Sequence, residues 1–127
     1  EQHFILDGAH NPAAAESLVQ TWRQEFGDTK ATLIFGTTHQ KKPAELLEVL
    51  APIVEESIYT TTPTDRGLRA GEIAERTKRP GKIEEDLERA LCSASEHRPI
   101  LVTGSLFLVG KALEWLGEKE GFEPSLQ

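Results

Sequence analysis

The sequence has 127 residues, 38% of them hydrophobic and 28% charged, and these values are typical of one domain with its own apolar core. Its formal net charge of −7 argues against nucleic acid or an acidic membrane as a partner, because both require a basic surface. No apolar run approaches the roughly 18 residues that a membrane span requires, and the first residues do not resemble a signal peptide.

The single cysteine, Cys92, cannot form an internal disulfide and suits a reducing compartment, so we expect a cytoplasmic protein. Because Cys92 stands among helix-forming residues, we expect it to be a small buried or half-buried side chain. Residues 118–127 are charged and contain glycine and proline, and we expect them to form a flexible tail.

Strand-like and helix-like segments alternate along the chain. In chain order we expect a strand at 3–7, a helix at 12–26, a strand at 31–35, a helix from 43 that Pro52 ends or bends, a strand at 57–61, a short helix at 70–77, a very short strand at 82–83, a helix at 84–96, a strand at 100–103 and a final helix from 106 whose first turn is buried. The helix at 12–26 shows the clearest pattern, because its apolar residues recur every three or four positions after the N-cap Asn11.

Strands that are apolar throughout and separated by helices indicate a parallel sheet covered on both faces. The predicted fold class is therefore α/β, a Rossmann-like three-layer domain with a mostly parallel sheet. Ligands of such sheets bind beyond the carboxyl ends of the strands. Functional residues are therefore expected in four segments, at 7–11, 36–42, 60–69 and 103–107.

The first of these segments contains a carboxylate, an imidazole and a helix start. Asp7 ends a strand and should project at the functional edge, while Gly8 permits close approach of a ligand. His10 can donate a hydrogen bond to a phosphate oxygen, and Asn11 begins a helix whose free N–H groups attract anions. A plain capped turn with an exposed histidine would use the same residue types, so both interpretations stay open.

The other segments carry cations or small residues. Lys41 and Lys42 precede a helix, where they can bind a phosphate or carboxylate or simply face solvent. Arg66 offers the paired donors that carboxylates and phosphates accept, and an interdomain ion pair or a surface charge suits it equally. Ser105 follows a glycine that lets the backbone approach a ligand, yet N-capping of the final helix alone would explain this serine.

Several common motifs are missing from the sequence. It has no Gly-x-Gly-x-x-Gly or Walker A loop, so it lacks a nucleotide phosphate cradle of its own. Its four histidines show no metal-ligand spacing, and no metal ligand is assigned. A triad of Ser105, His10 and Asp7 is conceivable, but Ser105 is not in a Gly-x-Ser-x-Gly elbow, which argues against it.

Two segments together resemble a known family. Residues 5–12 are similar to the motif that opens the carboxyl-terminal domain of folylpolyglutamate synthase/dihydrofolate synthase enzymes, which belong to the Mur ligase superfamily. Residues 101–110 are similar to the motif that closes that domain. The order and separation of the two motifs fit the family, and Gly8 in place of a tyrosine favours its folate branch.

The resemblance implies that residues 1–127 are a Mur ligase-type carboxyl-terminal domain, with a mostly parallel sheet and one antiparallel edge strand that would lie just upstream of Glu1. It implies an ATP-dependent ligase that adds L-glutamate to folate and/or dihydropteroate through an acyl phosphate, with ATP and Mg²⁺ as cofactors. The partner would be the protein's own amino-terminal P-loop domain, which holds most metal and folate ligands, in a monomeric enzyme. We therefore expect the isolated domain to be inactive.

The same resemblance implies roles for individual residues. Asp7 and Asn11 are expected to bind ATP. His10 and Ser105 are expected to lie at the reacting centre between the two domains. Each of these residues belongs to one of the two motifs.

Outside those motifs, Lys41 and Arg66 are expected to bind substrate. Lys41 matches the lysine of an Asp-Lys-Asp sequence in the family, whereas Gln40 and Lys42 replace both acids. Phe107 stands where the family often has tyrosine, which removes a hydroxyl.

Two other classes stay open. A muramyl-peptide- or cyanophycin-type ligase of the same superfamily would use a different substrate. A non-catalytic α/β binding module, such as a phospho-receiver domain, would also place an aspartate at a strand end. That module needs an acidic pair after its first strand and a lysine after its last, whereas this chain has one acid, Asp7, and ends its last strand with 103–105.

Overall fold

The computed structural model describes residues 3–39, 42–94, 97–118 and 125–126. The strands are β1 (Phe4–Asp7), β2 (Ala31–Phe35), β3 (Val54–Tyr59), β4 (Lys82–Ile83), β5 (Ile100–Thr103) and β6 (Ser125–Leu126). The helices are α1 (Pro12–Phe26), α2 (Pro43–Leu50), the 3₁₀ turn η1 (Ala51–Ile53), α3 (Ala70–Thr77), α4 (Leu87–Ser93) and α5 (Leu106–Gly117).

The strands form one sheet in the order β4-β3-β2-β5-β1-β6, and every pairing between these named strands is parallel. This confirms the predicted α/β class with a mostly parallel sheet. The antiparallel edge strand that the family resemblance implied is not among the described strands, and the edge beside β1 carries the parallel strand β6 instead.

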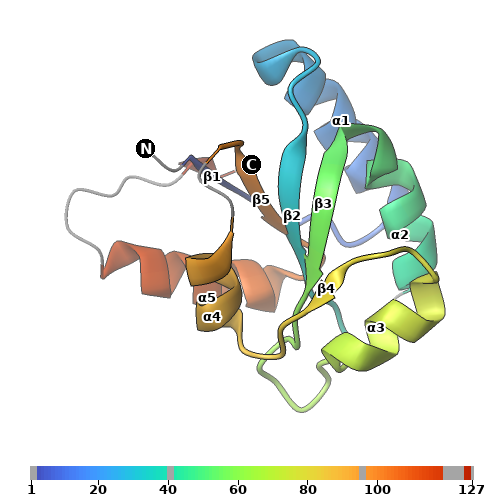
Figure 1. The fold of residues 1–127 in the computed structure, drawn as a ribbon, viewed down its shortest axis with the longest axis vertical. Coiled ribbons are helices and arrows are strands. Elements are labelled where there is room, and N and C mark those ends of the chain that lie inside the picture. Colours follow the sequence, from blue (N-terminus) through green and yellow to red (C-terminus); the bar gives the residue numbers. More distant parts are fainter. Residues whose placement is uncertain (1–2, 40–41, 95–96, 119–124, 127) are drawn as a thin grey trace.

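Helices cover both faces of the sheet, as Figure 1 shows. The buried residues of α1, α2 and α3 belong to one apolar cluster, and those of α4 and α5 belong to a second cluster on the opposite face. Side chains of a strand alternate between its faces, so in β1 Ile5 joins the first cluster whereas Phe4 and Leu6 join the second. Both faces are therefore buried, which explains why the strands are apolar throughout.

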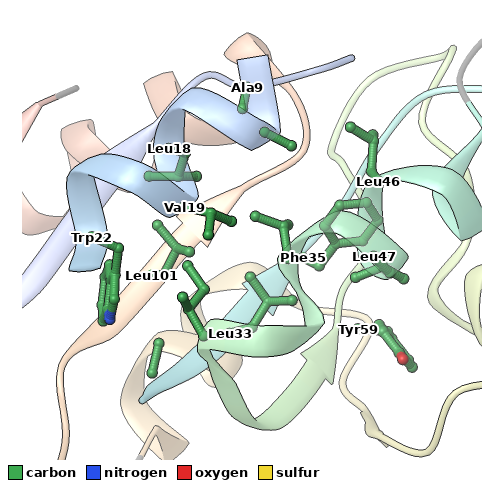
Figure 2. Packing of buried hydrophobic residues seen from close by; sticks show 14 of the residues in the cluster. Ala9, Leu18, Val19, Trp22, Leu33, Phe35, Leu46, Leu47, Tyr59 and Leu101 are labelled. Atoms are coloured by element: carbon green, nitrogen blue, oxygen red, sulfur yellow. The ribbon is translucent and has the colours of Figure 1, made fainter. Parts of the chain in front are cut away.

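The first cluster fixes α1 against the sheet. Figure 2 shows Leu18 and Val19 of this helix beside Leu33 of β2 and Leu101 of β5. Trp22 is 2% exposed, and its indole Nε1 donates a hydrogen bond of 2.8 Å to the carbonyl oxygen of Thr29. The bond ties the end of α1 to the loop that enters β2.

The connections reverse direction at the centre of the sheet. β1 leads through α1 to β2 on one side, whereas β5 leads through α5 to β6 on the other side, and β5 and β1 are neighbours. Such a reversal leaves a crevice at the carboxyl ends of the adjacent strands, where α/β sheets bind ligands. The segments that follow β1, β2 and β5 surround this crevice.

Some element boundaries differ from the predictions. β3 begins at Val54 rather than at 57, because α2 ends at Leu50 and the 3₁₀ turn η1, which contains Pro52, leads directly into the strand. α4 starts at Leu87 rather than at 84, because the side chain of Asp86 accepts a hydrogen bond from the Arg89 backbone N–H and caps the helix there.

One burial prediction was wrong, and a second was correct for only half of its residues. Cys92 is exposed, because α4 directs Leu91 and its other apolar residues to the sheet and leaves Cys92 on the outer side. The first turn of α5 is buried only in part, since Leu108 and Val109 are in the core whereas Leu106 is 67% and Phe107 43% exposed.

The expected tail at 118–127 lies mostly outside the described residues. Within that range, Ser125–Leu126 pair with β1 as strand β6. The helices within the described ranges are all too short or too polar to span a lipid bilayer.

Candidate functional site

The turns after β1 and β5 lie side by side at the carboxyl edge of the sheet. Asp7 is the register partner of Thr103, so the two strands end at the same level. The Thr103 hydroxyl then donates a hydrogen bond of 3.3 Å to the carbonyl oxygen of Ala9, although 94 positions separate these residues. The segments containing His10 and Ser105 are held together by this bond.

The carboxylate of Asp7 closes a tight turn by bonding to the backbone two residues further along the chain. Its Oδ1 accepts a hydrogen bond of 2.8 Å from the backbone N–H of Ala9. Burial raises the pKa of Asp7 above its ordinary value, and the hydrogen bond from Ala9 opposes that shift. Partial desolvation strengthens the interactions of this group with any cation or hydrogen-bond donor brought to the edge.

His10 has an unpaired nitrogen at this edge. Its Nδ1 is buried and finds no hydrogen-bond partner among the described residues. A buried polar atom without a partner costs free energy, and functional sites are where such atoms are retained. The imidazole is therefore available to bind a ligand from outside the described part of the chain.

A cavity of about 240 Å³ opens at the crevice. It is lined by His10 from the segment after β1, Thr38 from the segment after β2, and Ser105, Leu106 and Phe107 from the segment after β5. These segments follow three consecutive central strands, β2, β5 and β1. The cavity thus occupies the position that the topology predicts for a ligand.

Ser105 lines this cavity and also caps α5. Its Oγ accepts hydrogen bonds from the backbone N–H groups of Phe107, at 3.1 Å, and Leu108, at 3.4 Å. Capping uses the lone pairs of the oxygen and leaves the hydroxyl proton free to be donated. Both interpretations of this serine are therefore compatible with its geometry.

Asn11 caps α1 and does not line the cavity. Its Oδ1 accepts a hydrogen bond of 2.8 Å from the backbone N–H of Ala14, and the residue is exposed. This geometry matches the capping interpretation, while a nucleotide contact by Asn11 stays a prediction.

The segments after β2 and β3 are joined to each other. Thr38 and Gly67 form an antiparallel bridge. The N–H of His39 donates to the carbonyl oxygen of Arg66 at 2.9 Å, and the N–H of Leu68 donates to that of Thr37 at 2.9 Å. The exposed Arg66 is not among the cavity-lining residues. Lys41 lies outside the described residues, so its role stays a prediction.

Three lining residues were not singled out as site residues, although all three lie in segments where functional residues were expected: Thr38, Leu106 and Phe107. Thr38 comes directly after a strand end in a polar pair with Thr37, which is a signal that sequence reasoning could have used. The two apolar residues could not have been found in that way, because a helix start that is apolar on all sides indicates a buried position. Among the described residues, no group of three or more His, Cys, Asp or Glu side chains is placed to hold a metal ion.

The fold and the crevice define the class of this domain. This is a Rossmann-like α/β domain with a cavity at the reversal point of a parallel sheet, where such folds bind ligands. Residues 1–106 match the family described as "Mur ligase, glutamate ligase domain", and the chain belongs to this family.

Similar proteins and similar solved structures agree with this family assignment. The chain is 33% identical over 126 residues to dihydrofolate synthetase of Saccharomyces cerevisiae, covering 87% of this chain and 30% of that protein. It is similar to the crystal structure of folylpolyglutamate synthase from Thermotoga maritima, with a TM-score of 0.81, 36% identity, and coverage of 91% of this chain and 28% of that one.

A bifunctional folylpolyglutamate synthase/dihydrofolate synthase from Yersinia pestis, complexed with AMPPNP and Mn ion, matches with a TM-score of 0.78 and 30% identity. That match covers 90% of this chain and 28% of the Yersinia chain. The chain thus spans less than a third of the length of these relatives.

Proposed function

We propose that this chain is the carboxyl-terminal domain of a folylpolyglutamate synthase/dihydrofolate synthase-type ligase. The intact enzyme would use ATP to activate the carboxylate of folate and/or dihydropteroate as an acyl phosphate, to which L-glutamate is joined. This domain would close over ATP and help to bind glutamate. The enzyme would act as a monomer in the cytoplasm, where the unpaired Cys92 stays reduced.

One observation carries the proposal. The turn containing Asp7 and His10 and the turn containing Ser105 share one edge of the sheet and line or flank one cavity. A ligand held by a second domain opposite this edge would meet all three side chains together. Matches to relatives that are named as such ligases support this reading.

The residues at the edge suit a phosphate-bearing ligand. The unpaired Nδ1 of His10 and the free proton of Ser105 are hydrogen-bond donors or can become donors to phosphate oxygens. Bound ATP would supply the phosphoryl group, and bound Mg²⁺ would neutralise its charge. His10 and Ser105 would orient the phosphate, while Asp7 would accept hydrogen bonds from the nucleotide at the rim.

The exposed side chains of Leu106 and Phe107 flank these polar groups. When a second domain closes on this edge, the two apolar side chains would displace water from the cavity. Exclusion of water strengthens each polar interaction inside. The metal ligands are assigned to that second domain, together with the P-loop.

The test is ATP-dependent addition of glutamate by the intact enzyme that contains this chain, with Asp7→Ala as the variant. We expect the variant to lose at least about tenfold in kcat/KM for ATP, because a partly desolvated contact to the nucleotide is removed. Asp28→Ala is the matched control, since Asp28 is exposed in the turn after α1 and should leave kcat/KM unchanged. Full activity of Asp7→Ala would refute the nucleotide role.

The substrate class is tested by offering the intact enzyme dihydropteroate, folates and UDP-muramyl peptides in parallel. We expect glutamate addition to a pteridine substrate and none to the muramyl peptides. The opposite preference would assign the chain to a cell-wall ligase of the same family.

A further inference from the structure

We infer that Thr38 is a further ligand-binding residue, whose hydroxyl acts together with His10 to bind an oxyanion oxygen in the cavity at the sheet edge. The oxyanion is either a phosphate of the nucleotide or a carboxylate of the amino acid, and both offer the same negatively charged acceptor. The choice between these two ligands rests on the proposed function, whereas the hydroxyl contact itself does not.

The first argument is position. Thr38 follows β2, and β2 is the strand that flanks β5 on the side opposite to β1. Thr38 therefore lines the cavity from the side facing the His10 segment, with the Ser105 segment between them. A ligand that contacts His10 and Ser105 in this cavity also meets Thr38.

The second argument is that the hydroxyl of Thr38 is uncommitted. This hydroxyl makes no hydrogen bond within the described part of the chain, and the residue is half-buried rather than fully buried. The hydroxyls of two nearby threonines are hydrogen-bonded. The hydroxyl of Thr61 accepts from the Ala70 N–H, and that of Thr103 donates to Ala9. Thr37 has an unpaired hydroxyl, but it is fully buried and unreachable.

The third argument is that the backbone of Thr38 is fixed. Its bridge to Gly67 consists of two backbone hydrogen bonds, from His39 to Arg66 and from Leu68 to Thr37, which hold the chain on both sides of Thr38. A donor on a fixed backbone loses little conformational entropy when a ligand binds. The unpaired Nδ1 of His10 in the same cavity supplies the independent sign that a polar ligand belongs there.

The surroundings favour a hydrogen bond to an anion. The exposed carbons of Leu106 and Phe107 form the rest of the lining, so they exclude water from one side of the cavity. A hydrogen bond to a charged acceptor contributes more than one to a neutral acceptor, and more still where water is excluded. Removal of the Thr38 hydroxyl should therefore weaken binding measurably.

The experiment compares Thr38→Val with Thr38→Ser in the intact enzyme. Titration with ADP and, separately, with L-glutamate should show that Thr38→Val raises one of the two dissociation constants about tenfold. Thr38→Ser keeps a hydroxyl and should stay within about twofold of wild type. The weakened ligand identifies the source of the oxyanion. Thr21→Val is the matched control, since Thr21 lies on α1 away from the cavity.

Thermal unfolding of each variant verifies that it is folded, and Thr38→Ala provides a second hydroxyl-free variant should Thr38→Val not fold. The inference is overturned when both dissociation constants of the folded hydroxyl-free variant match those of wild type. Glutamate ligation is assayed in the same preparations. A wild-type enzyme that binds ADP through Thr38 but adds no glutamate would refute the proposed function and leave the Thr38 contact intact.

Discussion

Asp7 and Thr103 lie side by side at the ends of two parallel strands, although most of the chain separates them in sequence. The side chain of each then reaches Ala9: the carboxylate of Asp7 accepts from its N–H, and the hydroxyl of Thr103 donates to its carbonyl oxygen. Both bonds hold the segment that carries His10, so the position of this imidazole depends on two strands at once.

The raised pKa of Asp7 predicts a pH dependence of stability. Burial raises the pKa above the ordinary value of 3.8, so the folded state holds the proton more tightly than the unfolded state. The resulting stabilisation is fully present below pH 3.8 and is lost as the pH rises through the folded-state pKa. In Asp7→Asn this titration is absent, so the wild type should lose stability relative to this variant as the pH rises above 3.8.

Chemical denaturation at a series of pH values measures this difference. Asp28→Asn is the control, because it makes the same substitution at an exposed aspartate in the turn after α1. Parallel profiles for wild type and Asp7→Asn would mean that the carboxylate is not desolvated in the folded protein.

The two proposed roles of Ser105 are separable. Ser105→Ala removes the cap of α5 and should reduce the free energy of unfolding by about 1 kcal/mol. Asp86→Ala removes the cap of α4 and should cost a similar amount, but this helix start is not part of the cavity. We expect only Ser105→Ala to lower the ligase activity of the intact enzyme, by at least about tenfold. Equal activities of the two variants would leave Ser105 with the capping role alone.

The two glycines at this edge should respond differently to substitution. Gly104 has a φ of 119°, and an added Cβ would meet the carbonyl oxygen of Gly36, directly after the neighbouring strand β2. Gly104→Ala should therefore destabilise the fold by at least about 2 kcal/mol. An added Cβ at Gly8 would meet only the tip of the Leu106 side chain, which is exposed and can move. Gly8→Ala should cost less than about 1 kcal/mol, as urea denaturation would reveal.

The purified 127-residue chain should bind ATP weakly and catalyse no glutamate addition. The sequence has no phosphate-binding loop of its own. Isothermal titration with ATP and a radiolabelled glutamate assay would measure the two properties. Turnover by this chain alone would contradict the assignment of the phosphate cradle to another domain.

Much of the fold could be predicted from local patterns. The helix at Pro12–Phe26 has the predicted ends, because an N-cap, a proline and a terminal glycine all mark them in the sequence. The start of β3 was predicted too late, since a 3₁₀ turn after α2 continues into the strand without a loop. The position of that turn depends on packing against the sheet, which periodicity does not report.

The candidate site was predictable only in part. The rule that ligands bind beyond parallel strand ends directs attention to His10 and Ser105, and the cavity includes both. The same rule does not separate Thr38, which lines the cavity, from Arg66, which does not. That distinction depends on strand order and on the bridge between Thr38 and Gly67, which appear only in three dimensions.

The position of β5 between β1 and β2 has a consequence for biosynthesis. When residues 1–90 of this domain have left the ribosome, both flanking strands have been made, but the strand that joins them in the sheet is still missing. Because β5 pairs with both, the nascent chain cannot close its sheet until Ile100–Thr103 has emerged. Truncated translation products should therefore expose two unpaired strand edges, which are a preferred substrate for chaperones and a starting point for aggregation.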